Sequence, residues 1–205
     1  LITSECAVDI FKKAKAEGFK TSYVSNGNGS PEVLEYLHPH LDCFKIDLKS
    51  FRDKSYRELG GVLSKVTGTI CNAVRMGFWT EIVTLVVPGF NDDESELKEM
   101  CQFIASVSVD IPWHATAFYG TYKMAGVDNT PVNTLLRAAE IGKEAGLRFV
   151  YLGNVPGGVG RWENTYCPHC EEELVVRRGY RIVKNDLKNN RCSRCLRIVP
   201  GRWTQ

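Results

Sequence analysis

Four cysteines near the end of the chain have the spacing of a metal site. Cys167 and Cys170 form one C-x-x-C pair, Cys192 and Cys195 form a second, and 21 residues separate the two pairs. Two such pairs can surround one Zn²⁺ ion with a tetrahedron of thiolates. Zinc is the interpretation we favour, with an iron–sulfur centre and disulfide bonds as alternatives. We do not expect His169 to be a ligand, because four sulfurs complete the coordination shell.

The segment that carries these cysteines, residues 164–205, is predicted to be a zinc ribbon. Between the pairs, residues 174–176 and 180–183 have the pattern of two short strands joined by a turn. A segment of this length cannot bury enough apolar surface to fold alone, and a bound metal would supply the missing stability.

The predicted ribbon is more basic than the rest of the chain. It carries nine basic and four acidic residues, whereas residues 1–163 carry 17 basic and 20 acidic ones. Tyr180 and Trp203 lie among its basic residues, and this composition permits nucleic-acid binding. We favour solvated surface charge as the explanation and expect no nucleic-acid partner.

A second candidate site lies in residues 43–49, which read as a strand. Side chains alternate along a strand, so the apolar and charged residues here fall on opposite faces. Asp47 and Lys49 share the charged face at the carboxyl end of this strand. There they could bind a small zwitterionic or hydroxylated ligand, with Lys49 holding a carboxylate and Asp47 an amine or hydroxyl. The alternative is an edge strand whose polar face meets water.

Three weaker signals accompany this pair. Asn26 and Gly27 end a strand, and the glycine permits a positive φ and a close backbone approach to a ligand, although the pattern is also that of an ordinary turn. His114 lies near the start of a strand and is either functional or a hydrogen-bonded core residue. The glycine-rich residues 153–160 lack the order of a nucleotide-binding loop and favour a flexible linker.

The elements that would position these residues alternate between helix and strand. Helices are predicted over about residues 5–16, 31–37 and 66–76, after an N-cap at Asp92, and from Thr130 to Gly146. Strands are predicted over residues 20–25, 43–49, 80–87, 113–118 and 147–152. Strands separated by helices run parallel, so the fold class is α/β with a parallel sheet.

The segment that contains these helices and strands, residues 1–153, is too short for a complete eight-stranded barrel, which takes about 250 residues. It is therefore either an open doubly wound sheet or the later part of a barrel whose first strands are missing. We expect residues 1–153 to form a partial (β/α) barrel, residues 154–163 a glycine-rich linker and residues 164–205 the ribbon. Because the chain begins with Leu1, we also expect it to be a fragment of a longer polypeptide.

The composition narrows the class of protein. The chain has 205 residues, of which 43% are apolar and 24% are charged, which excludes a disordered or collagen-like protein. Neither a membrane span nor a signal peptide is apparent, so we expect a cytoplasmic protein with no membrane partner. The scattered Cys6, Cys43, Cys71 and Cys101 are expected to be small buried apolar residues.

Taken together, six segments resemble radical S-adenosylmethionine (SAM) enzymes of the type of pyruvate formate-lyase activating enzyme, and in particular the radical SAM component of the AmmeMemoRadiSam system. In chain order they are Tyr23-Val24-Ser25-Asn26-Gly27, Phe44-Lys45-Ile46-Asp47-Leu48-Lys49, Leu85-Val86-Val87-Pro88-Gly89-Phe90-Asn91-Asp92, Pro112-Trp113-His114 with Tyr122-Lys123-Met124, Tyr151-Leu152-Gly153-Asn154-Val155-Pro156-Gly157, and Glu163-Asn164-Thr165-Tyr166-Cys167-Pro168.

This resemblance implies that a [4Fe-4S] cluster reductively cleaves SAM to a 5′-deoxyadenosyl radical, which abstracts hydrogen from a substrate. It implies SAM contacts from Asn26, Gly27, Asp47, Lys49 and His114. It also implies an electron donor such as flavodoxin or ferredoxin, and a protein substrate among the candidate partners.

The sequence departs from the family in two ways. The C-x-x-x-C-x-x-C motif that holds the cluster does not occur in these 205 residues, so we expect the chain alone to be inactive. We favour cluster ligands that lie outside these residues, and the alternative is a degenerate homologue of the family. Ala117 and the segment Tyr119-Gly120-Thr121 replace an arginine and a proline-containing turn. Two other functions remain open: a non-enzymatic zinc-ribbon module that binds nucleic acid or protein, and an aldolase-like enzyme with Lys49 as a Schiff-base lysine.

Overall fold

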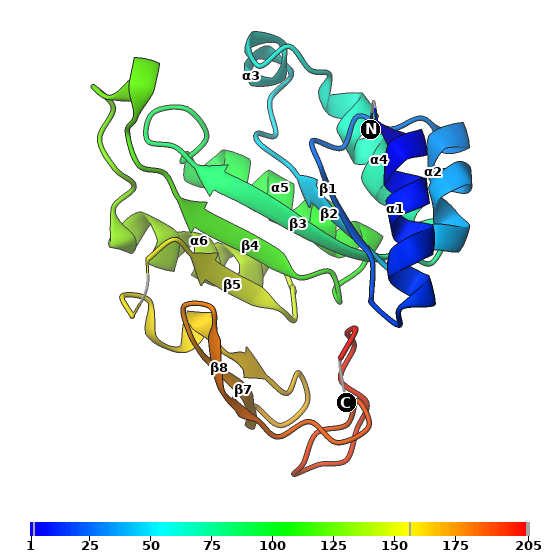
Figure 1. The fold of residues 1–205 in the computed structure, drawn as a ribbon. Helices are drawn as coiled ribbons and strands as arrows, with labels where there is room; N and C mark the ends of the chain where they lie inside the picture. The colour runs from blue at the N-terminus through cyan, green and yellow to red at the C-terminus, as the bar shows by residue number, and fades with distance from the viewer. Residues whose placement is uncertain (2, 156, 204–205) are drawn as a thin grey trace. The chain divides into compact units, whose positions relative to one another are not determined.

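The fold is an α/β fold with a small β module at the C-terminus (Figure 1). It comes from a computed structural model that describes residues 1, 3–155 and 157–203. The helices are α1 (Ser4–Ala16), α2 (Pro31–Leu37), α3 (Asp53–Glu58), α4 (Leu63–Arg75), α5 (Glu94–Val107) and α6 (Val132–Glu144), with short 3-10 turns η1 (His38–His40), η2 (Tyr122–Met124) and η3 (Gly160–Glu163). The strands are β1 (Ser22–Ser25), β2 (Cys43–Asp47), β3 (Trp79–Val86), β4 (Trp113–Ala117), β5 (Val150–Gly153), β6 (Thr165–Tyr166), β7 (Glu173–Arg178) and β8 (Arg181–Asn185).

The first five strands form a parallel sheet in the order β1-β2-β3-β4-β5. A doubly wound sheet reverses its strand order near the middle, whereas successive βα units of a barrel lie side by side in chain order. The observed order therefore confirms the partial-barrel interpretation over the doubly wound one. None of the described helices is long and apolar enough to cross a membrane.

The chain divides into two compact units, Leu1–Val83 and Thr84–Gln205. In the first unit the apolar face of β2 is fully buried, because Phe44, Ile46 and Leu48 each have no exposed surface. Ile70 of α4 and Leu34 of α2 are buried to the same extent. The alternation predicted for residues 43–49 is thus confirmed.

In the second unit α6 packs on β4 and β5 and lies beside α5. The fully buried Trp113 donates its Nε1–H to Thr84 Oγ1 at 3.0 Å. A Cβ atom on Gly142 of α6 would lie 3.1 Å from the Trp113 ring and 3.0 Å from a methyl of Val150. A glycine in the last turn of this helix therefore lets it approach the sheet closely.

The C-terminal module is a three-stranded antiparallel sheet in the order β6-β7-β8. Its hairpin turns at Gly179, which has a φ of +57°. The two strands predicted between the cysteine pairs are confirmed. The first extends beyond both of its predicted ends, and the second begins one residue later and ends two residues later than predicted. Domain boundaries at residues 153 and 163 stay a prediction, and Pro156 in the predicted linker lies outside the described residues.

Several predicted element ends are wrong for identifiable reasons. β5 begins at Val150 rather than at residue 147, because its partner β4 begins only at Trp113, which pairs with Val150. The N-cap of α5 is Asp93, whose side chain accepts the Glu96 N–H, whereas Asp92 accepts the Gly89 N–H. Helix α3 was not predicted at all.

Candidate functional site

The four predicted zinc ligands converge on one point. The Sγ atoms of Cys167, Cys170, Cys192 and Cys195 all lie within 4.8 Å of one another. Cys167 Sγ is 3.6 Å from Cys195 Sγ, and Cys170 Sγ is 3.7 Å from Cys192 Sγ. A tetrahedral zinc site with Zn–S bonds of about 2.3 Å has S–S edges of about 3.8 Å. The four sulfurs can therefore hold one metal ion.

These distances are far longer than the roughly 2.05 Å of a disulfide bond, and none of the eight cysteines, all of which lie in the described residues, forms a disulfide. The disulfide alternative is thus wrong. His169 is exposed and contacts Arg197 through its ring, with 3.3 Å between Nδ1 and the guanidinium. It is not part of the converging group.

The backbone favours a thiolate in the second cysteine pair. The amides of Arg194 and Cys195 donate to Cys192 Sγ at 3.4 and 3.5 Å. Burial raises the pKa of Cys192, but these two amides and the neighbouring thiols lower it by more, so its pKa is about 7. Burial raises the pKa of Cys167 to about 12 when no metal is bound. A metal ion that binds here therefore displaces protons.

The four-cysteine group is embedded in an apolar core rather than exposed on a loop. Cys167 and Cys192 are fully buried and belong to a cluster that includes Leu174, Val199 and Phe149. Phe149 directly precedes β5 of the parallel sheet. The cysteines thus contribute to the packing of the second unit as well as to the metal site.

Asp47 and Lys49 form an ion pair at the carboxyl end of β2. Lys49 Nζ is 2.8 Å from Asp47 Oδ2, and the two side chains are 41% and 32% exposed. The pair is therefore neither buried nor splayed into solvent. Half-exposed charges that already point toward one another can exchange partners with an incoming zwitterion at little cost.

Tyr56 of α3 supports this pair, a role that sequence reasoning missed. Its hydroxyl oxygen accepts the Lys49 backbone N–H at 3.0 Å, and the residue is 3% exposed. Burial raises the pKa of Tyr56, the bond from Lys49 lowers it by less, and the charge of Asp47 raises it further. Asp53 at the start of α3 and the Gly60-Gly61 pair after its end were the signals that could have revealed the helix.

Asn26 and Gly27 lie at the same edge of the sheet as Asp47. Ser25, the last residue of β1, pairs in parallel with Ile46 of β2. Asn26 is exposed and its Oδ1 accepts the Asn28 N–H at 3.2 Å, which closes a tight turn. Asn26, which directly follows β1, and Asp47, the last residue of β2, thus lie at the same edge of the sheet, where ligands of such sheets bind, and their contact with a common ligand stays a prediction.

Gly27 is required by packing. Its φ is +76°, and an added Cβ would lie 2.8 Å from methyl carbons of both Ile46 and Val66. Since those neighbours belong to the core, the predicted role in admitting a ligand is not needed to explain this glycine.

We expect Gly27→Ala to destabilise the protein by about 2–4 kcal/mol, because it adds a left-handed backbone penalty to a clash with two branched side chains. Gly77→Ala is the matched control, since Gly77 has a φ of +85° with nothing within 4 Å of its Cβ position. Urea unfolding of both variants measures the difference. Equal losses would mean that the backbone conformation alone matters.

His114 is the second residue of β4 and stacks on Tyr151 of β5, with ring centroids 5.1 Å apart and planes at 24°. Ligands of parallel sheets bind beyond the carboxyl ends of the strands, and His114 lies near the opposite end of its own strand. Its predicted contact with SAM stays a prediction without support from this position. Tyr119, just past the carboxyl end of β4, donates its hydroxyl to Asn154 O at 2.6 Å.

The remaining cysteines are dispersed. Cys101 is buried and burial raises its pKa to about 12, whereas Cys43 is half-buried. Cys6 and Cys71 are exposed, so the expectation that they are buried is wrong. They lie on the outward faces of α1 and α4. In the described residues the four-cysteine group of the ribbon is the one cysteine cluster that could hold a metal.

Comparison with solved structures defines the class of fold. A domain of a pyruvate-formate lyase-activating enzyme from Bacteroides vulgatus superimposes with a TM-score of 0.66 at 17% identity, covering 75% of this chain and 92% of that one. TYW1 with a lysine-pyruvate adduct bound gives a TM-score of 0.51 at 22% identity, covering 67% of this chain and 44% of that one. At these identities the similarity establishes the fold.

A relative is also recognisable by sequence. An uncharacterized protein of Methanocaldococcus jannaschii is 34% identical over 185 residues, which make up 89% of this chain and 54% of that protein. The chain therefore spans about half the length of this relative. No family model matches the chain.

Proposed function

We propose that this chain is the C-terminal portion of a radical SAM enzyme, which uses a [4Fe-4S] cluster to cleave SAM reductively and directs the resulting 5′-deoxyadenosyl radical to a hydrogen of its substrate. The fold shared with an activating-enzyme domain supports this class. The observation that carries the proposal is the Asp47–Lys49 pair at the carboxyl end of β2.

The residues present fit SAM. The methionyl end of SAM carries an amine and a carboxylate, and its ribose offers two hydroxyls. Lys49 would hold the carboxylate, and Asp47 would accept from the amine or a ribose hydroxyl. Asn26, exposed at the adjoining turn, would donate its amide to the nucleoside. Tyr56 fixes the backbone of Lys49 and so orients the lysine side chain.

The residues present do not fit the cluster. Outside the ribbon, Cys6, Cys43, Cys71 and Cys101 lie in different elements and form no group in the described part of the chain. The proposal therefore assigns the cluster to cysteines outside these 205 residues. The same proposal includes an electron donor such as flavodoxin or ferredoxin. It also includes a cytoplasmic location and membership of the AmmeMemoRadiSam system.

The second part of the proposal concerns the metal of the ribbon. Tetrahedral S–S distances and a buried setting support a structural Zn²⁺ held by Cys167, Cys170, Cys192 and Cys195. A closed shell of four sulfurs leaves no position for substrate, so the role is structural rather than catalytic.

The test is anaerobic reconstitution of the full-length protein with iron and sulfide, followed by reduction in the presence of SAM. We expect the absorption of a [4Fe-4S] cluster and the formation of 5′-deoxyadenosine, together with one zinc per chain. A full-length protein that assembles no cluster and forms no 5′-deoxyadenosine would refute the assignment.

A further inference from the structure

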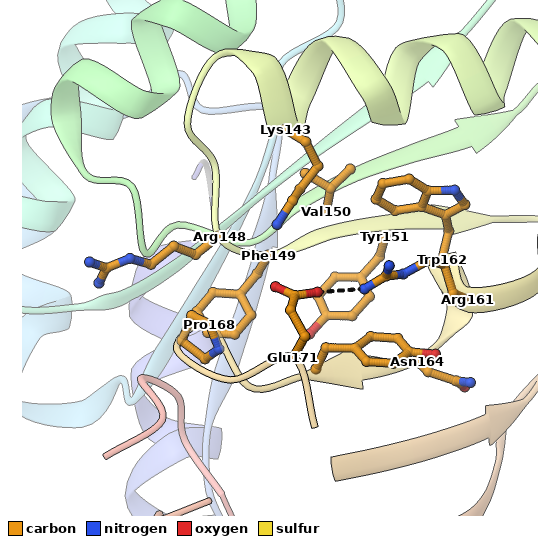
Figure 2. Close-up of a pocket in the computed structure, with 11 residues that line it drawn as sticks. Lys143, Arg148, Phe149, Val150, Tyr151, Arg161, Trp162, Asn164, Pro168 and Glu171 are labelled. Atoms are coloured by element: carbon orange, nitrogen blue, oxygen red, sulfur yellow. Dashed lines mark hydrogen bonds and ion pairs between the residues drawn. The ribbon is translucent and has the colours of Figure 1, made fainter. Parts of the chain in front are cut away.

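A small cavity of about 80 Å³ lies in the second unit, away from the Asp47–Lys49 pair in sequence and built from other elements. It is bounded by the end of α6, the start of β5, η3, β6, and Pro168 and Glu171 beside the first cysteine pair (Figure 2). A cavity that holds one buried water has a volume of roughly 10–15 Å³, so this cavity is several times larger and has room for a planar ring.

Aromatic side chains form much of the wall. Phe149 is 4% exposed, and Tyr151, Trp162 and Tyr166 are half-buried around it. Tyr151 is held in place by its stack on His114, by the Arg177 guanidinium 5.5 Å from its centroid, and by its hydroxyl, which is 2.8 Å from Thr165 Oγ1. A wall whose side chains are fixed in advance loses little entropy when a planar ligand packs against it.

Basic side chains are among the lining residues. In Figure 2 the side chains of Lys143 and Arg161 extend toward the cavity, whereas the Arg148 guanidinium points away from the other labelled residues. Arg148 is paired with Asp110 at 2.9 Å, and Arg161 with Glu171 at 2.7 Å, so these four charges balance. The Lys143 ammonium is exposed and has no ion-pair partner within residues 1, 3–155 and 157–203. The cavity therefore has one uncompensated positive charge.

The Arg161 guanidinium also belongs to the wall. It lies 4.4 Å from the centroid of the Tyr166 ring and 5.9 Å from that of Trp162. Its ion pair with Glu171 holds it in place. Guanidinium planes contact unpaired bases in much the same way as aromatic rings do, so Arg161 adds a planar cation to the aromatic wall.

We propose that this cavity binds a nucleotide, with the base against the aromatic wall and the phosphate at Lys143. An apolar ligand would leave the lysine charge unused, and an acidic peptide would leave the aromatic wall unused. A base with an attached phosphate satisfies both, because the volume accommodates the ring while the phosphate stays at the exposed opening. The nucleotide is either free or part of a single strand.

The proposal is tested by titrating the full-length protein with AMP, GMP, CMP and UMP and with a fluorescent single-stranded RNA. S-Adenosylhomocysteine is kept in excess so that the proposed SAM site does not contribute. We expect saturable binding. Trp162→Leu should weaken it about tenfold or more by removing a stacking surface. Lys143→Gln should weaken it several-fold and lower the salt slope of RNA binding by about one.

Matched controls are Lys98→Gln, an exposed lysine of α5, and Tyr122→Leu, an aromatic residue that is 87% exposed. Both should bind within about twofold of the unmodified protein, since neither lines the cavity. Binding of mononucleotides identifies a free nucleotide, and binding of RNA alone identifies a strand; each supports the proposal.

The proposal is overturned if no probe binds at millimolar concentration, if an acidic peptide or benzoate binds instead, or if Lys143→Gln binds as tightly as the unmodified protein. Because Lys143 is exposed, its variant keeps the test valid should Trp162→Leu fail to fold. None of these results depends on cluster assembly or SAM cleavage.

Discussion

Cys192→Ser is expected to abolish stoichiometric metal binding and to unfold the ribbon. A structural zinc site contributes about 10–16 kcal/mol of apparent binding free energy, which is as large as the whole stability of an ordinary domain, about 5–15 kcal/mol. A serine hydroxyl is a poor substitute for one of four thiolates. Metal analysis of the purified variant and thermal unfolding measure the effect, with a chelator on the unmodified protein as a parallel experiment.

Cys71→Ser is the control, because Cys71 is exposed on α4 and lies outside the four-cysteine group. It should keep its metal and its melting temperature. If Cys192→Ser retained one zinc per chain and unfolded at the same temperature as this control, the metal centre would not be the source of ribbon stability.

Lys49→Ala is expected to weaken SAM binding by about 10- to 100-fold, since a hydrogen bond to a charged group contributes about 1.5–3 kcal/mol. The same change should alter stability by less than about 1 kcal/mol, because the Lys49 and Asp47 side chains are 41% and 32% exposed. Isothermal titration with SAM and urea unfolding separate the two effects.

Lys45→Ala is the matched control for this prediction. Lys45 lies on the same strand and the same face as Asp47 and Lys49, but nearer the amino end of β2. Lys45→Ala removes the same charge as Lys49→Ala, and its SAM affinity should stay within about twofold of that of the unmodified protein. Equal weakening in both variants would point to a general electrostatic effect and against a site at the carboxyl end of the strand.

The predictable parts of the fold are those that a short local sequence pattern determines. Leu97, Met100, Cys101 and Ile104 recur at helical spacing, and all four are buried on α5. The two C-x-x-C pairs specify a tetrahedron almost independently of their surroundings. In both cases a short local rule determines the outcome.

Other features depend on partners that are distant in sequence. The strand predicted over residues 20–25 begins only at Ser22, and the backbone N–H of Thr21 donates to Asp42 Oδ2 at 2.9 Å. Helix α4 begins at Leu63 after Val62, which has no capping side chain, so no local signal marked its start. Tyr56 could not be connected to Lys49 because the contact depends on how α3 turns back toward β2.

The nucleotide cavity was likewise beyond sequence reasoning. Its lining residues range from Lys143 to Glu171 and come from two different sheets, and no motif unites them. The basic residues that line the cavity come from α6, η3 and the turn before β5, and no sequence motif connects these three elements. Spacing alone does not reveal such a convergence.

The apolar cluster that joins Phe149 to Cys167 and Cys192 makes metal supply a folding variable for the cell. An ion that binds the native form alone raises the native population by mass action. Scarcity of that ion would therefore first increase amide hydrogen exchange along β5, at the end of the sheet where Phe149 enters it. The amount of folded protein would then follow the metal content of the growth medium, although the ion takes no part in the reaction that we propose for this protein.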